Sequence, residues 1–138
     1  MAQDLYLCVT NLFGDILVSF TTKAINVGEY VLVLHEGRLT TQEVDEARTK
    51  AIHLLEANKW KKMLVDLRKA TIGVTDLELF YFTASHREKF PLGMKIAVVG
   101  NPKDHHKTSF ADTVSCNRGV RMQTFDNWDQ ATEWLVKR

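Results

Sequence analysis

The chain has little of what marks secreted or membrane-spanning proteins. It contains 2 cysteines and 2 prolines in 138 residues, and no apolar run approaches the roughly 20 residues that a membrane-spanning helix needs. Cys8 and Cys116 stand far apart and do not make a disulfide framework. The first residues lack the basic start and the apolar run of a signal peptide. We therefore expect a cytoplasmic protein with reduced thiols and no membrane span.

An excess of charge of one sign is also absent. The sequence has 18 basic and 17 acidic residues, for a net charge of +1. A nearly neutral chain gives no electrostatic reason to expect a nucleic acid or an anionic membrane surface as a partner. Apolar residues make up 45% of the chain and charged residues 25%, proportions typical of a globular protein. The length suits one domain around one core.

From Asp15 onward, apolar residues follow strand and helix periods in turn. The strands are expected at residues 16–25, 30–36, 63–67, 96–99 and 120–125. The helices are expected at residues 40–58, 75–90, 104–116 and 128–135. Thr40 with Glu43, and Thr75 with Glu78, have the spacing of capping boxes, which start helices. The order ββαβαβαβα predicts an α/β fold with a mixed five-stranded sheet, parallel in its later strands, and four helices.

Four segments carry a resemblance to a known family, namely GEYVLVLHEGRLTTQEV, KMLVDLR, MKIAVVG and VRMQTFDNWDQATEWL. In this order they resemble the SpoIIAA-like branch of the STAS-like proteins, a group related in shape to the SEC14-type lipid-binding domains. The resemblance covers residues 15–138 and implies a single STAS-like domain there. Residues 1–14 lie outside it as an N-terminal arm, for which a free arm, an edge strand and a dimer contact remain open.

The resemblance directs attention to Thr75. Anti-sigma-factor antagonists of this superfamily carry an Asp-Ser-Ser/Thr-Gly phosphorylation motif after the third strand, and the matching stretch here, DLRKATIGVTDLELF, lacks that motif. Thr75 lies near the expected position but is followed by Asp76, with no glycine after it. As a phosphoacceptor, Thr75 would place its phosphate at a helix N-terminus. As a plain N-cap, it would only start the helix.

A second group of candidate residues lies at or just beyond the C-terminal ends of the predicted parallel strands. Open α/β sheets bind ligands at this edge. A polar crevice there would be formed by Asp66, Arg68, Gly73, Gly100 and Asn101. The alternative is turn chemistry, in which the glycines allow a positive φ and Asp66 pairs with Arg68.

The sequence contains no metal-binding or catalytic motif. His105 and His106 are adjacent at a helix start, so they point in different directions and do not form a metal-binding face. Cys116 lies near a helix C-terminus, which disfavours a reactive thiolate. We therefore expect no metal, no cofactor and no enzymatic activity. An enzyme would have to use Asp66 or His86 in a closed pocket.

The predicted helix that contains LELFYFTASHREKF is unusual because two of its faces are apolar, whereas a surface helix has one apolar stripe. One stripe consists of Leu77, Phe80, Tyr81 and Ala84. The other consists of Leu79, Phe82, His86 and Phe90. This second stripe would be buried within the chain, form a homodimer interface or wall an apolar ligand pocket.

Two functions follow from these expectations. The first, implied by the resemblance, is a non-enzymatic regulatory or protein-interaction module that binds a protein partner or itself through the predicted second helix. The second is a carrier or sensor of a small apolar, lipid-like ligand, as the SEC14-type relatives imply; the aromatic residues of that helix support it. A flat apolar patch would favour a protein contact, and an enclosed cavity would favour a ligand.

Overall fold

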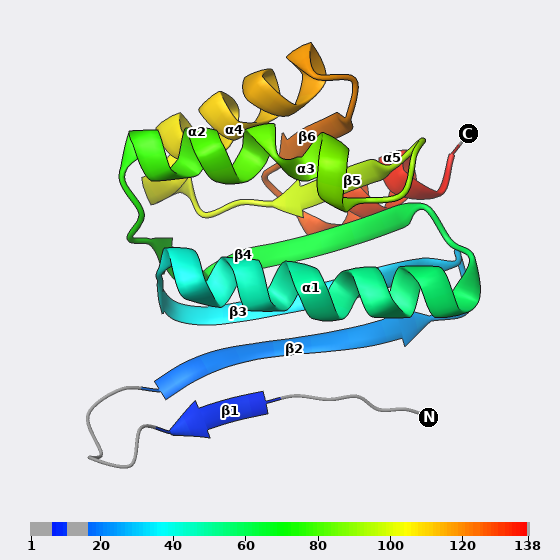
Figure 1. The fold of residues 1–138 in the computed structure, drawn as a ribbon, viewed down its shortest axis with the longest axis horizontal. Helices are drawn as coiled ribbons and strands as arrows, with labels where there is room; N and C mark the ends of the chain where they lie inside the picture. Colours follow the sequence, from blue (N-terminus) through cyan, green and yellow to red (C-terminus); the bar gives the residue numbers. More distant parts are fainter. Residues whose placement is uncertain (1–6, 11–16, 138) are drawn as a thin grey trace.

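The computed structural model describes residues 7–10 and 17–137. Its strands form one mixed sheet in the order β1-β2-β3-β4-β5-β6 (Figure 1). Their bounds are β1 (Leu7–Thr10), β2 (Leu17–Ile25), β3 (Tyr30–Leu39), β4 (Lys62–Ile72), β5 (Lys95–Val99) and β6 (Arg121–Phe125). The first three strands pair antiparallel, and β3 to β6 pair parallel.

The predicted α/β fold and its five mixed strands are confirmed. The short β1 extends the sheet by one strand and lies within the predicted N-terminal arm, where it pairs with β2 as an edge strand. An edge strand was one of the three forms that the sequence left open for the arm. The division of the chain into an arm of residues 1–14 and a domain of residues 15–138 remains a prediction.

Helices cover both faces of this sheet (Figure 1). Their bounds are α1 (Thr41–Asn58), α2 (Asp76–Ala84), α3 (His86–Lys89), the 3-10 helix η1 (Pro102–Asp104), α4 (His105–Asn117) and α5 (Trp128–Val136). Right-handed crossovers between successive parallel strands place their helices on one face, which explains the common side of α1, α2, α3 and α4. Because α5 follows the last strand and makes no crossover, it can cover the other face.

Capping residues determine where the main helices begin. The Thr40 hydroxyl accepts a bond from the Glu43 amide at 3.2 Å, and the Glu43 carboxylate accepts one from the Thr40 amide at 3.0 Å. The second predicted capping box, at Thr75 and Glu78, has the same reciprocal bonds at 3.1 and 2.8 Å. Asn127 caps α5 by accepting from the amide of residue 130. Both predicted capping boxes are confirmed.

The structure differs from the prediction in the length of two strands. β3 and β4 continue past the predicted ends at residues 36 and 67, and the added residues 37–39 of β3 pair with residues 70–72 of β4. The register shifts between Leu34 and Glu36. Pairing satisfies the backbone groups of these residues, whose mixture of glycine, polar and apolar types does not give a clear strand pattern.

The predicted helix at residues 75–90 is interrupted at Ser85, which separates α2 from α3. Ser85 has φ −81° and ψ −5°, and its hydroxyl donates to the Phe82 carbonyl at 2.7 Å. A serine hydroxyl that bonds to a nearby carbonyl competes with the helical backbone bonds. The apolar pattern missed the break because its inward-facing residues continue from α2 into α3.

The core has two parts, one on each face of the sheet. The larger part joins α1 and the segment after α3 to one face of β4, which presents Met63, Val65 and Leu67 in alternate positions. The smaller part joins α5 to the opposite face through Leu64, Ala131 and Leu135. The alternation along β4 is the two-residue period of a strand buried on both faces.

Candidate functional site

A cavity of about 110 Å³ lies between the sheet and the helices α1, α2, α3 and α4. Apolar side chains of the sheet, among them Val33, Met63 and Ile96, line its inner side. α2, which covers the cavity, packs mainly on α4 and less on α1. The exposed residues Thr41 and Glu78 also line it. The cavity therefore reaches the surface between the N-terminal ends of α1 and α2.

The structure brings together the four residues of the second predicted stripe. Leu79, Phe82, His86 and Phe90 all line the cavity. The ring centroid of His86 lies 5.0 Å from that of Phe82 and 5.1 Å from that of Phe90, in edge-to-face geometry. These residues face a concave space and not the outer surface of the helix.

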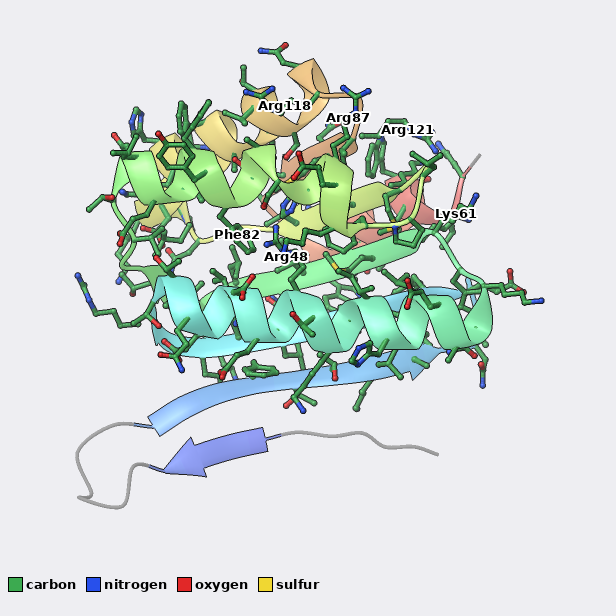
Figure 2. The ribbon with its side chains drawn as sticks, in the orientation of Figure 1. Arg48, Lys61, Phe82, Arg87, Arg118 and Arg121 are labelled. Atoms are coloured by element: carbon green, nitrogen blue, oxygen red, sulfur yellow. The ribbon has the colours of Figure 1, made fainter. Side chains whose placement is uncertain are left out.

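Arg48, on α1, reaches across the cavity to α2 and α3. Its side chain is only 5% exposed, and Figure 2 shows it beneath Phe82. The guanidinium carbon lies 4.2 Å from the centre of the Phe82 ring. Nη1 donates to the Phe82 carbonyl and to Ser85 Oγ, both at 2.9 Å. Nη2 donates to Asp45 at 3.0 Å. Arg48 thus ties α1 to the break between α2 and α3.

The same guanidinium fixes the tautomer of His86, and burial keeps the ring uncharged. Nη1 of Arg48 lies 3.1 Å from His86 Nδ1. A guanidinium has only donors, so Nδ1 must accept this bond and the ring proton must be on Nε2. Burial, with a smaller contribution from the charge of Arg48, lowers the pKa of His86 from 6.5 to about 3. At neutral pH the ring is therefore uncharged and carries one N–H donor.

A second buried histidine, His35 on β3, also lines the cavity. Among the described residues, its Nδ1 is the one fully buried side-chain nitrogen or oxygen that has no hydrogen bond. Burial lowers the pKa of His35 from 6.5 to about 4, so this ring is also neutral at pH 7. Its ring centroid is 6.1 Å from that of Phe20.

The sequence interpretation missed Arg48 and His35. A signal for Arg48 was present, since residue 48 lies one helical turn after Val44 and one before Ala51, in the apolar stripe of α1. A charged residue within such a stripe is buried only when it has partners. His35 gave no comparable signal, because a histidine within an apolar strand fits either face.

With the cavity described, comparison with known proteins places the fold. A family model described as SpoIIAA-like matches residues 31–136. The chain belongs to this family. The predicted resemblance is thereby confirmed, and the match omits the N-terminal part of the sheet. No curated protein sequence matches the chain.

Two solved structures share the SpoIIAA-like fold of this chain. One is an anti-sigma factor antagonist from Mycobacterium paratuberculosis, with 18% identity, a TM-score of 0.53, and coverage of 86% of this chain and 96% of its own. The other is an uncharacterized protein of the DUF3478 family from Shewanella loihica PV-4, described as having a SpoIIAA-like fold. It has 14% identity, a TM-score of 0.51 and 98% coverage of both chains. At these identities the likeness concerns the fold alone.

In this SpoIIAA-like protein the predicted polar crevice is separate from the cavity, because none of its five residues lines it. Asp66 is buried on the α5 face and accepts from Arg68 Nη2 at 2.7 Å and Nε at 2.9 Å. These bonds outweigh burial and lower the pKa of Asp66. The Arg68 guanidinium lies 5.2 Å from the centre of the Trp128 ring.

The other three residues of the predicted crevice make turns and close contacts. A Cβ at Gly73 would lie 2.7 Å from the carbonyl oxygen of residue 39, and one at Gly100 would lie 2.9 Å from Thr124. The Asn101 side chain accepts from the amide of residue 103 and donates to the carbonyl of residue 70. The two glycines permit close approach, and neither has a positive φ.

Thr75 is exposed at the start of α2, outside the cavity lining, and its hydroxyl accepts the capping bond from the Glu78 amide.

The two adjacent histidines contact different residues. His105 Nε2 lies 3.4 Å from Ser109 Oγ, and Nε2 of the exposed His106 lies 4.0 Å from Asp76 Oδ2. Within residues 7–10 and 17–137, no three His, Cys, Asp or Glu side chains gather where they could hold a metal ion. None of the helices described there is long and apolar enough to cross a membrane.

The first predicted stripe of α2 faces outward. Leu77 is 63% exposed and Tyr81 is 65% exposed. Phe80 lies between them, half-buried, with the Arg118 guanidinium 5.5 Å from its ring centre. Figure 2 shows Arg87 and Arg118 at the same side of the molecule, beside the ends of α3 and α4. This surface combines aromatic, aliphatic and cationic side chains.

Proposed function

We propose that this protein is a non-enzymatic sensor of a small apolar ligand, which binds in the cavity under α2. The observation that carries the proposal is the convergence of Leu79, Phe82, His86 and Phe90 on one concave, mostly apolar space. A concave apolar site with few polar groups is the usual form of a small-molecule site. The ligand would act on the packing of α2, because α2 forms one side of the cavity.

The chemistry of the cavity supports binding without catalysis. A general base at neutral pH needs a pKa near 7, whereas the pKa of His86 is about 3. The hydroxyls of Thr83 and Thr108, which line the cavity, donate to carbonyls of their own helices. Asp66, the other residue that an enzyme would need, lies on the opposite face and is paired with Arg68.

The test is a titration with methylenecyclohexane, a hydrocarbon of suitable size, monitored by the methyl NMR signals of Met63 and Ile96. Both residues line the cavity, so we expect saturable shifts at both methyls. Val44→Phe should abolish them, because Val44 is half-buried and lines the cavity. Lys50→Phe, at an exposed position of the same helix that does not line the cavity, is the matched control. The proposal would be refuted if neither methyl signal of the unmodified protein moved during the titration.

A second candidate function is a protein-interaction module that uses the outward face of α2. Exposed Leu77 and Tyr81 beside Arg118 support it, since tyrosine and arginine are enriched at protein interfaces. The partner would be a protein or a second copy of this chain. Sedimentation velocity of unmodified protein and of the Tyr81→Lys variant tests self-association. A concentration-dependent dimer that the variant loses supports it, and a monomer at all concentrations contradicts self-association.

A further inference from the structure

We infer that the cavity selects an uncharged ligand with one hydrogen-bond acceptor, such as a small cyclic ketone or ester, and that His86 Nε2 donates to this acceptor. The inference rests on the proposed ligand-binding function and specifies the chemistry of recognition. It follows from the positions of Arg48 and His86, from the state of the other polar groups and from the cavity volume.

The first argument is the position of the free donor. Arg48 occupies His86 Nδ1, and Nε2 makes no hydrogen bond to any described residue. Nε2 is nevertheless not a fully buried atom, because His35 Nδ1 is the only unpaired side-chain atom of that kind in the described part of the chain. His86 is 4% exposed and lines the cavity. The inference places the open side of Nε2 in the cavity that His86 lines.

The second argument is that the neighbouring donors already have partners. The hydroxyls of Thr83 and Thr108 donate to backbone carbonyls. Lys107 Nζ donates to the carbonyl of residue 74 at 2.6 Å and to Asp76 at 3.0 Å. His35 also lines the cavity, and its Nδ1 is fully buried without a hydrogen bond. Of the two histidines, only His86 has its Nδ1 occupied by Arg48, which fixes the ring proton on Nε2 and makes this atom a committed donor.

The third argument concerns the charge of the ligand. Arg48 is the buried cation nearest to His86, and its charge is paired with Asp45 at 3.0 Å. The two hydrogens of its Nη1 are already shared among three acceptors. A carboxylate in this mostly apolar space would lose its hydration without gaining an unpaired cation, which is costly. The site therefore favours a neutral acceptor over an anion.

The fourth argument is size. An engineered apolar cavity of about 150 Å³ holds benzene, and the present cavity measures about 110 Å³. The present cavity is smaller, so a single six-membered ring would fill it and extend into its mouth between the N-terminal ends of α1 and α2. Long acyl chains and multi-ring molecules would need the helices to move apart.

The experiment compares cyclohexanone with methylenecyclohexane, which has the same shape but a CH2 group in place of the ketone oxygen. Binding of each is measured to unmodified protein and to His86→Phe. The phenylalanine keeps an aromatic ring between Phe82 and Phe90 and removes the donor. His53→Phe, at an exposed position of α1, is the matched control.

We expect His86→Phe to raise the Kd of cyclohexanone by about threefold to tenfold, the range of one hydrogen bond. The Kd of methylenecyclohexane should change less than twofold. His53→Phe should leave both values unchanged, and cyclohexanecarboxylate should bind more weakly than cyclohexanone. Equal effects of His86→Phe on both rings, or tighter binding of the carboxylate, would overturn the inference.

A measurement on unmodified protein covers the case in which His86→Phe does not fold. The ¹⁵N signals of the His86 ring should show a protonated Nε2 and an unprotonated Nδ1, and cyclohexanone should shift Nε2. A protonated Nδ1, or an Nε2 signal that saturating cyclohexanone leaves in place, would overturn the inference. If neither ring binds at all, the proposed function itself fails. If both bind with no effect at His86, only the present inference fails.

Discussion

Arg48 is a buried cation whose partners come from three elements, α1, α2 and α3. Replacing it with Met would leave Ser85 and His86 Nδ1 without their donor. We expect Arg48→Met to lower the free energy of unfolding by about 2–4 kcal/mol, since buried groups that lose a charged partner are costly. Urea denaturation measures this loss. The exposed Lys50→Met should stay within about 0.5 kcal/mol of the unmodified protein, and an equally small effect at Arg48 would contradict the described network.

The buried histidines predict a loss of stability in acid. The pKa of His35 is lowered to about 4 and that of His86 to about 3, against 6.5 for an ordinary histidine. The unfolded chain therefore binds protons that the folded protein does not, so stability is fully present above pH 6.5 and decreases as the pH falls. From pH 7 to 5 we expect a loss of about 2 kcal/mol per histidine.

His86→Phe isolates the share of one histidine in this loss. The decrease between pH 7 and 5, measured by urea denaturation, should be about 2 kcal/mol smaller in the variant. Asp112, whose pKa burial raises to about 6, acts in the opposite direction and is present in both proteins, so it cancels. Identical pH profiles would show that His86 is not held neutral.

At the scale of the element, α2 depends on its N-terminal cap more than a helix packed on the sheet would, because its main contact is α4. Thr75→Ala removes the hydroxyl that accepts from the Glu78 amide. We expect a loss of about 1 kcal/mol, with faster amide exchange in the first turn of α2. Thr75→Ser keeps the hydroxyl and should remain close to the unmodified protein. If serine were as destabilising as alanine, the cap would not be the cause.

The elements also show which parts of the fold could be read from the sequence. Both capping boxes lie where the local pattern predicted them, because a cap is formed by residues three positions apart. The extensions of β3 and β4 and the break at Ser85 were missed. The two extensions are long-range, because they pair with each other. The break at Ser85 combines a local bond to the Phe82 carbonyl with a bond from Arg48, which is 37 positions away.

At the scale of the whole molecule, the cavity exists only when the sheet and its covering helices are assembled. A ligand of the cavity should therefore bind the folded protein and not the unfolded chain. Cyclohexanone at ten times its Kd should raise the free energy of unfolding by about 1.4 kcal/mol. Urea denaturation with and without the ketone measures this, with the Val44→Phe variant as control. An equal gain in that variant would indicate a solvent effect.

The sequence by itself determined the order of the elements, the caps and the two apolar faces of residues 77–90, because each depends on neighbours within one or two helical turns. Only the tertiary structure decided which face of α2 points inward. Two apolar stripes on one helix are equivalent until a second surface covers one of them. That surface is formed by strands and helices distant in the chain, and their contacts leave Leu77 and Tyr81 outside while Leu79 and His86 line the cavity.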